Sequence, residues 1–143
     1  MPERYELKLF GNIAPGVPAS SPLHRCFQGE AWGAVMYQAL RRSLITLNSH
    51  IDMVGREAGN ARLFEATGVG TFLLTDFKDN LQTLFEPSRE VVAWRSVNEC
   101  LSMIDRYLND EDERTAVAMA SQHTFDAHVQ ATRDDILQFV GKS

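Results

Sequence analysis

Two glutamates lie on either side of a predicted helix start, in a pattern suited to binding a phosphorylated ligand. Gly59 and Asn60 are residue types that commonly precede helices. The unpaired backbone N–H groups of such a helix start bind a phosphate or diphosphate without any lysine. Glu65 lies five residues beyond Asn60, where its carboxylate can accept hydrogen bonds from both hydroxyls of a ribose. Glu57 precedes the helix and would reach the other side of the phosphates.

These residues also have plainer interpretations. Glu57 is most simply a loop carboxylate, and Glu65 a residue on the surface of a helix. The apolar pair Leu63 and Phe64 directly before Glu65 fits a fully solvated position less well. His50 follows a predicted strand, where it is either polar lining of the site or an ordinary loop histidine.

Strands and helices alternate along the chain. Alternating or continuous apolar runs predict strands, and apolar residues at helical spacing predict helices. We expect strands over residues 5–10, 23–28, 44–48, 71–75 and 91–94. We expect helices over residues 31–43, 60–68, 81–85, 96–108 and 112–140, the last with a break near His123 and Thr124. In the first of these helices, Trp32 and Val35 lie on the face that we expect to be buried.

Two of the helix starts carry their own signals. Ser96 followed by Glu99 is a capping box. The acidic run over residues 109–113 suits the positive end of a helix dipole. It therefore predicts a solvated helix start rather than a metal site.

The alternation predicts an α/β fold with a Rossmann-like, doubly wound parallel sheet, because parallel strands need crossover connections that helices supply. In such sheets ligands bind at the carboxyl ends of the strands. The loop after Phe10 and the segment after Asn48 both lie there, and the second segment carries His50 and the two glutamates. Asp76 and Asn80 follow another strand and would face the same crevice, although Asp76 is also placed to cap the next turn.

Composition bounds the class of protein. The chain has 143 residues, the length of one domain, of which 44% are apolar and 23% charged, as in globular proteins. Its net charge of −5 argues against a nucleic-acid-binding protein with a broad basic face. No apolar run approaches the roughly 20 residues that span a bilayer, and the first residues lack the apolar stretch of a signal peptide. We therefore expect a cytoplasmic protein in which Cys26 and Cys100 are reduced.

Several segments together resemble a known family of enzymes. They are residues 60–66 (NARLFEA), 68–76 (GVGTFLLTD), 84–87 (LFEP) and 90–92 (EVV), with shorter matches at 36–41, 47–48, 107–108 and 123–125. In order and spacing they are similar to the carboxyl-terminal domain of GT-B glycosyltransferases, and most similar to the CgeB-type spore-protein glycosyltransferase family. The likeness covers about residues 29–137. It implies the donor-binding half of a GT-B fold, in which a sugar is transferred from a nucleoside diphosphate donor.

The resemblance also implies roles for the two glutamates. Glu57 and Glu65, with seven residues between them, resemble the paired-glutamate motif of retaining members of the family. Glu57 would be the catalytic residue that contacts the donor sugar and holds it for transfer. Glu65 would bind the ribose of the nucleotide.

The helix start has an implied role as well. Gly59, Asn60 and Ala61 would meet the diphosphate of the donor, and Arg62 would either add positive charge there or point into solvent. Members of the family need no bound metal, because helix amides and basic groups balance the charge of the leaving diphosphate. The sequence has no dense His and Asp cluster that contradicts this. We therefore expect a nucleoside diphosphate sugar as the substrate, with no metal and no cofactor.

Two departures from the family bear on activity. GT-B enzymes have two Rossmann-like domains with the site between them, whereas residues 1–143 have the length of one. Neither the acceptor-binding domain nor the strand and glycine turn that open the second domain are found. We therefore expect a fragment, a subunit that needs an acceptor-binding partner, or a remnant. A non-catalytic Rossmann-like binding or assembly module is the alternative. A flavodoxin-like receiver domain fits less well, because Gly11 and Asn12 stand where it needs an acidic cluster.

Overall fold

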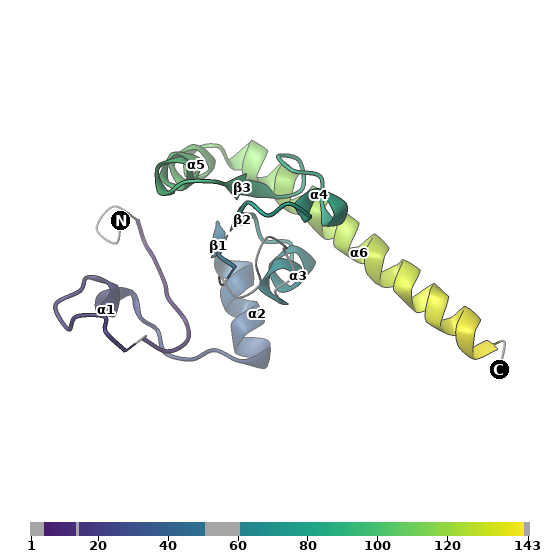
Figure 1. The fold of residues 1–143 in the computed structure, drawn as a ribbon, viewed down its shortest axis with the longest axis horizontal. Helices are drawn as coiled ribbons and strands as arrows, with labels where there is room; N and C mark the ends of the chain where they lie inside the picture. The colour runs from purple at the N-terminus through teal and green to yellow at the C-terminus, as the bar shows by residue number, and fades with distance from the viewer. Residues whose placement is uncertain (1–4, 14, 51–60, 142–143) are drawn as a thin grey trace. The chain divides into compact units, whose positions relative to one another are not determined.

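The chain forms two compact units, Met1–Ala39 and Leu40–Ser143, in a computed structural model that describes residues 5–13, 15–50 and 61–141. All three strands of the described residues belong to the second unit, as Figure 1 shows by their labels. The candidate site therefore has to be built on the second unit.

The first unit contains a helical turn where the sequence predicts a strand. Helix α1 spans Leu23–Cys26, so the strand predicted over residues 23–28 is wrong. Pro22 explains the difference, because its ring holds φ at a helical value, here −57°. The hydroxyl of Ser21 also accepts a hydrogen bond from the Leu23 amide at 3.3 Å, which supports the first turn.

The strand predicted over residues 5–10 is reduced to a single bridge. Leu9 pairs with Phe27 in a parallel β-bridge through two backbone hydrogen bonds of 2.8 Å. Phe27 directly follows α1, and Gly29 has a φ of +81°, outside the strand region. The partner segment is therefore too short to extend the pairing.

Helix α2 (Gly33–Arg42) confirms the helix predicted from the amphipathic pattern of this region. Its last turn, from Leu40 onward, belongs to the second unit, where Leu40 is buried. The prediction that Trp32 and Val35 are buried is wrong, since they are 76% and 60% exposed. Trp32 precedes the first turn, and its indole N–H donates to the Glu30 carboxylate at 3.2 Å.

The second unit is built on a three-stranded parallel sheet in the order β1-β2-β3. The strands are β1 (Thr46–Asn48), β2 (Leu73–Asp76) and β3 (Val92–Trp94), each overlapping a predicted strand. Helix α3 (Ala61–Gly68) connects β1 to β2, and α4 (Leu81–Leu84) lies between β2 and β3. This confirms the α/β, Rossmann-like class that the alternation of elements predicts.

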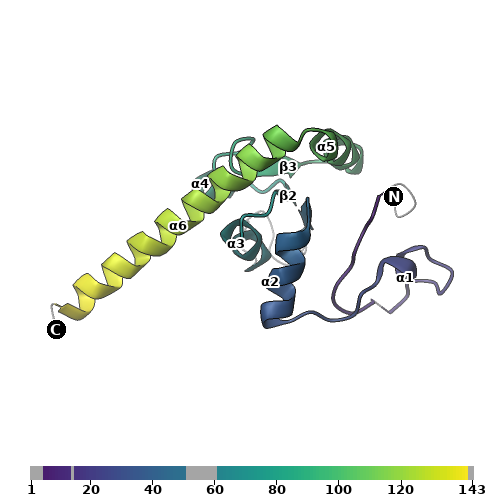
Figure 2. The same cartoon turned by 180° about the vertical axis from the view of Figure 1, so that it is seen from behind.

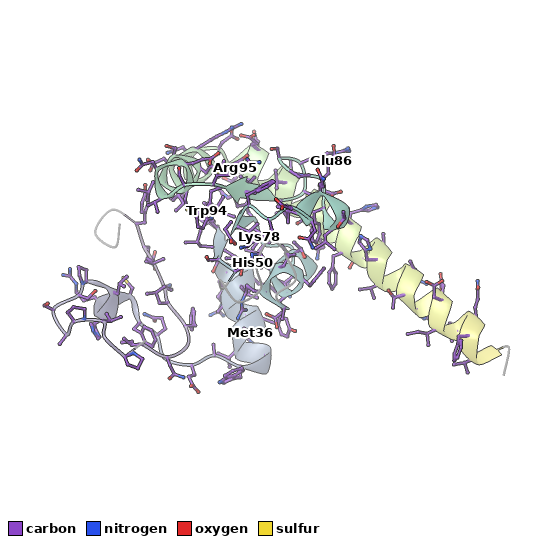
Figure 3. All side chains as sticks on the ribbon, in the orientation of Figure 1. Met36, His50, Lys78, Glu86, Trp94 and Arg95 are labelled. Atoms are coloured by element: carbon purple, nitrogen blue, oxygen red, sulfur yellow. The ribbon has the colours of Figure 1, made fainter. Side chains whose placement is uncertain are left out.

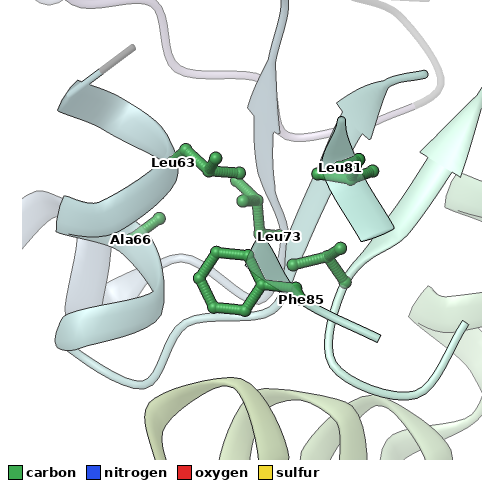
Figure 4. Close-up of a cluster of buried hydrophobic side chains, with 6 residues drawn as sticks. Leu63, Ala66, Leu73, Leu81 and Phe85 are labelled. Carbon is green, nitrogen blue, oxygen red and sulfur yellow. The ribbon is translucent and has the colours of Figure 1, made fainter. Parts of the chain in front are cut away.

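The first three residues of the central strand β2 are fully buried. Leu73, Leu74 and Thr75 have no exposed surface, as expected for the middle strand of a parallel sheet. Leu73 belongs to a cluster with side chains of α3 and α4, which Figure 4 shows in close-up. The other members of this cluster are Leu63, Ala66, Leu81, Phe85 and Val91.

Helix α5 (Val97–Asn109) packs against Phe72, the residue directly before Leu73. Successive side chains of a strand point to opposite faces, so Phe72 points away from the α3 cluster. Its ring packs on Tyr107 of α5, with 4.4 Å between ring centroids. Helices therefore flank the sheet on both faces.

Helices α5 and α6 (Glu111–Gly141) both begin at predicted caps. The Ser96 hydroxyl accepts a hydrogen bond from the Glu99 amide at 3.2 Å. Asp110 Oδ1 accepts one from the Glu113 amide at 2.9 Å, within the acidic run. The Ser96 cap and the solvated helix start are thus confirmed. The capping box forms only in part, because the Glu99 carboxylate accepts a hydrogen bond from the Arg95 amide at 2.8 Å instead of from the Ser96 amide.

Helix α6 is continuous, so the predicted break near His123 and Thr124 is wrong. No proline or glycine interrupts the helix before Gly141, and the Thr124 hydroxyl donates to the Glu90 carboxylate without disturbing the backbone. Figures 1 and 2 show its first half against the unit and its second half extending past α3 and α4. Neither α6 nor any other described helix combines the length and the apolar character needed to cross a membrane.

The first half of α6 packs closely on the end of α3. A Cβ atom on Gly68 would lie 2.9 Å from the Phe125 ring, closer than Cβ atoms normally approach other atoms. The side-chain amide of Gln122 donates to the Gly68 carbonyl at 3.3 Å. The absence of a side chain at position 68 therefore allows the two helices to meet.

We expect Gly68→Ala to lower the free energy of unfolding by about 1–3 kcal/mol, because the added methyl group overpacks against Phe125. Gly141→Ala is the matched control, since nothing lies within 4 Å of a Cβ there. Urea unfolding of both variants measures the difference. An equal, small effect of the two substitutions would contradict the packing of α6 on α3.

Candidate functional site at the carboxyl edge of the sheet

The carboxyl ends of the three strands bring polar and charged side chains to one edge of the sheet. Asn48 of β1 pairs with Thr75 of β2, and Asp76 pairs with Trp94 of β3. The strands therefore end level with one another, and the residues that follow them share an edge. This is the edge at which open α/β sheets bind ligands.

Asp76 is the centre of a cluster that joins the ends of β1 and β2. Its Oδ1 accepts hydrogen bonds from the His50 backbone N–H at 2.9 Å and from the His50 ring Nδ1 at 2.7 Å. Its Oδ2 lies 3.4 Å from Lys78 Nζ. The His50 side chain is fully buried, and the other two side chains are each 14% exposed. Figure 3 shows His50 and Lys78 close together near these strand ends.

Burial of Asp76 raises the pKa of its carboxyl group. Hydrogen bonds from the side chain and the backbone of His50 lower this pKa, and together with the contributions below they outweigh the effect of burial. The charge of His50 and the contact with Lys78 act in the same direction, so the pKa lies below its ordinary value of 3.8. Asp76 is therefore ionised at neutral pH. Because an ionised carboxylate only accepts hydrogen bonds, His50 carries a hydrogen on Nδ1.

Buried side chains continue the connection between β1 and β2. The Asn48 side-chain amide donates to the Thr75 hydroxyl at 3.0 Å. That hydroxyl donates to Asp76 Oδ1 at 3.4 Å. Buried hydrogen bonds from Asn48 through Thr75 therefore reach Asp76, and they limit the positions that its carboxylate can take.

The end of β3 adds a cation and an indole group. The Arg95 guanidinium lies 3.7 Å above the ring of Phe77, in a cation–π contact. The Phe77 amide donates to the Trp94 carbonyl at 2.8 Å, which extends the pairing of β2 with β3. The indole Nε1 of Trp94 is buried and has no hydrogen-bond acceptor among the residues that the structure describes.

Helix α3 begins at the same edge. The chain must return from the end of β1 to the start of the parallel β2, so the crossover helix starts near the carboxyl ends of the strands. No acidic residue lies in the first turn of α3, so its backbone N–H groups keep their positive potential. Arg62 Nη1 lies 3.2 Å from Glu65 Oε2, and the two side chains are 38% and 25% exposed.

The structure describes part of the predicted site. His50 is not an ordinary loop histidine, because it is buried and hydrogen-bonded to Asp76. Ala61 starts α3, and Arg62 forms an ion pair with Glu65 instead of only pointing into solvent. Three predicted site residues lie outside the described residues: Glu57, Gly59 and Asn60. The binding and catalytic roles of all the predicted site residues stay predictions.

A metal site is not found in the described part of the chain, where no group of three or more His, Cys, Asp or Glu side chains could hold an ion. The expectation of metal-free binding remains a prediction, because residues 51–60 are not described.

Sequence reasoning missed Lys78, Trp94 and Arg95. A signal was present, because Lys78 follows a predicted strand by three residues and Trp94 ends one. The position at a strand end is therefore a better guide to these residues than any local motif.

Comparison with known proteins decides the family. The glycosyl transferase-like family matches residues 2–137, nearly the whole chain. The chain belongs to the glycosyl transferase-like family. No curated protein sequence matches it, and no solved structure does. Membership of this family supports a role in glycosyl transfer, and the parallel sheet supplies the α/β fold expected of a glycosyltransferase domain.

We expect Asp76→Asn to lower the free energy of unfolding at pH 7 by about 1–3 kcal/mol, because the charged hydrogen bonds to His50 and the contact with Lys78 weaken. The lowered pKa of Asp76 means that its carboxylate stabilises the fold above pH 3.8 and loses this effect as the pH falls further. The difference between the parent and the variant should therefore narrow below that pH.

Urea unfolding at a series of pH values measures this difference. The exposed Asp112, in the first turn of α6, provides the matched control Asp112→Asn. A difference for Asp76→Asn that stays constant through the acidic range would contradict the ionised cluster.

Proposed function

We propose that this domain is the donor-binding half of a retaining GT-B glycosyltransferase of the CgeB type, and that it binds a nucleoside diphosphate sugar. The observation that supports this most is the gathering of groups at one sheet edge. The start of α3, the ammonium of Lys78 and the carboxylate of Glu65 all belong to segments that begin at the carboxyl ends of the strands. The family membership supports the transfer of a sugar.

The diphosphate is proposed to lie at the start of α3. The first backbone N–H groups of a helix have no partner within the helix, and an anion satisfies them. Lys78, at the end of the neighbouring strand, would add a positive charge to the same edge. Together these groups would stabilise the negative charge that develops on the leaving diphosphate, and they would do so without a metal ion.

The ribose is proposed to lie against Glu65. This residue is one turn into α3, and its side chain is partly buried, at 25% exposure. Arg62 contacts Oε2 of the carboxylate, so Oε1 is the oxygen assigned to the ribose hydroxyls. Arg62 would then act as a positioning residue, because it holds the carboxylate in one orientation.

Transfer would need groups beyond the described residues. Glu57 is proposed to contact the donor sugar and hold it for transfer. An acceptor must also be held against the donor, and such orientation accounts for about 7–11 kcal/mol of a barrier when it is well made. We assign that task to an acceptor-binding domain or a partner subunit.

We expect Glu65→Ala to weaken the binding of a nucleoside diphosphate by about 1–3 kcal/mol, the range for losing hydrogen bonds to a charged group. Isothermal titration calorimetry with uridine, guanosine and adenosine diphosphates measures the affinity. Glu111→Ala, at an exposed glutamate in the first turn of α6, is the control. Equal affinities for the two variants would remove Glu65 from the site, and a folded parent chain that binds no nucleotide would contradict the proposal.

We expect nucleotide binding to persist in excess chelator, because helix amides and Lys78 would balance the charge of the diphosphate. The same titration with and without chelator tests this. Loss of binding that is restored by magnesium or manganese would contradict the metal-free site.

A further inference from the structure

The second half of α6 presents an apolar stripe that its own unit does not cover. Every residue from 126 to 141 is exposed. Phe125, Val129, Thr132 and Ile136 follow one another at intervals of four, three and four residues, which places them on one face of the helix. Val129 and Ile136 are 51% and 58% exposed. This spacing is that of a coiled-coil seam.

The stripe leads into a groove on the body of the unit. The groove has a volume of about 380 Å³ and is lined by Phe64 of α3, Phe85 after α4, and Phe125, Val129 and Ile136 of α6. It lies where α6 leaves the unit, so the covered face of the first half continues directly into the exposed face of the second half.

We infer that this stripe pairs with the same stripe of a second copy of the chain, in an antiparallel two-helix seam. The seam would place Phe125 against the partner's Ile136, and Val129 against the partner's Thr132. By the two-fold symmetry of such a pair each contact occurs twice. The partner's helix end would then lie at the groove beside Phe125.

Charge complementarity points to a second copy and to this register. In an antiparallel seam the residues that flank the stripe on one side face the residues on the same side of the partner helix. Asp126 then faces the partner's Arg133, and His128 faces the partner's Asp135. Each pair also forms twice, so the seam contains two ion pairs and two contacts in which a histidine ring can donate a hydrogen bond to a carboxylate.

Other arrangements of two copies lack this match. Sliding the antiparallel pair by one heptad places Arg133 against the partner's Arg133 and Asp135 against the partner's Asp135. A parallel pair in register places His128 against the partner's Arg133. The first alternative opposes like charges and the second lacks the ion pair of Asp126 with Arg133, so the sequence favours the arrangement that forms this pair.

The first test is the mass of the chain in solution. Sedimentation equilibrium over a concentration series reaching about 1 mM, the weak end of specific association, should show a monomer–dimer equilibrium. Ile136→Asp should abolish the dimer, whereas Gln138→Asp, an exposed position off the stripe, should leave it intact. A monomer at every concentration would overturn the inference and leave the stripe to a different partner, and a dimer that survives Ile136→Asp would place the interface elsewhere.

The second test is a charge exchange that fixes the register. Arg133→Asp should weaken the dimer roughly tenfold, because it sets two pairs of acidic groups against each other. The double variant Asp126→Arg with Arg133→Asp should restore the parent affinity. The two residues are seven positions apart on one helix, about 10 Å along its axis, so restoration cannot arise within a single chain. Failure of the double variant to restore the dimer would overturn the proposed register.

Discussion

The burial of β2 is the constraint on which the rest of the second unit depends. A strand whose first three residues have no exposed surface needs a neighbouring strand on each edge and helices on each face. Leu73 packs with α3 and α4, while Phe72 packs with α5, so the two faces are covered by helices from different parts of the chain. The strand ends at a polar residue, Asp76, where the chain leaves the buried sheet.

The position of Asp76 explains why charged groups collect at one edge. A carboxylate at the end of a buried strand has little water around it, so it must find donors in the protein. His50 and Lys78 supply them from the ends of two strands, and the result is an ordered cluster. Such a cluster stabilises the junction of β1 with β2 and at the same time keeps a lysine at the carboxyl edge of the sheet. The proposed anion binding would therefore draw on the same residues as fold stability.

The elements that could be predicted are those whose signals are local and agree with their surroundings. Residues 71–75 form a continuous apolar run, which only a buried strand or helix accommodates, and the chain does form β2 there. Ser96 with Glu99 fixed the start of α5 in the same way. Residues 5–10 also show an alternation of apolar and polar residues, but a strand needs a partner segment of matching length. The partner segment at Phe27 is short, because the helical turn α1 occupies the residues before it.

The site was only partly predictable, for a related physical reason. Glu65 and Arg62 were predicted from their positions relative to one helix start, because spacing within a single helical segment determines where side chains lie along it. The contact of His50 with Asp76 joins residues 26 positions apart, and it depends on the register of β1 with β2. Sequence spacing contains no information on that register, so Lys78 and Arg95 gained their significance only from the sheet.

Helix α6 shows how one periodic pattern can serve two environments. In its first half this face packs on the end of α3, where the Phe125 ring lies against Gly68 and Gln122 donates to the Gly68 carbonyl. In the second half the same face carries Val129 and Ile136, which are 51% and 58% exposed and suit a seam between helices. A helical segment without tertiary contacts is only marginally stable in water, even with internal pairs such as Gln130 with Asp134. Pairing of this face would therefore stabilise the helix itself, and the gain would come from burying apolar area that the unit leaves exposed.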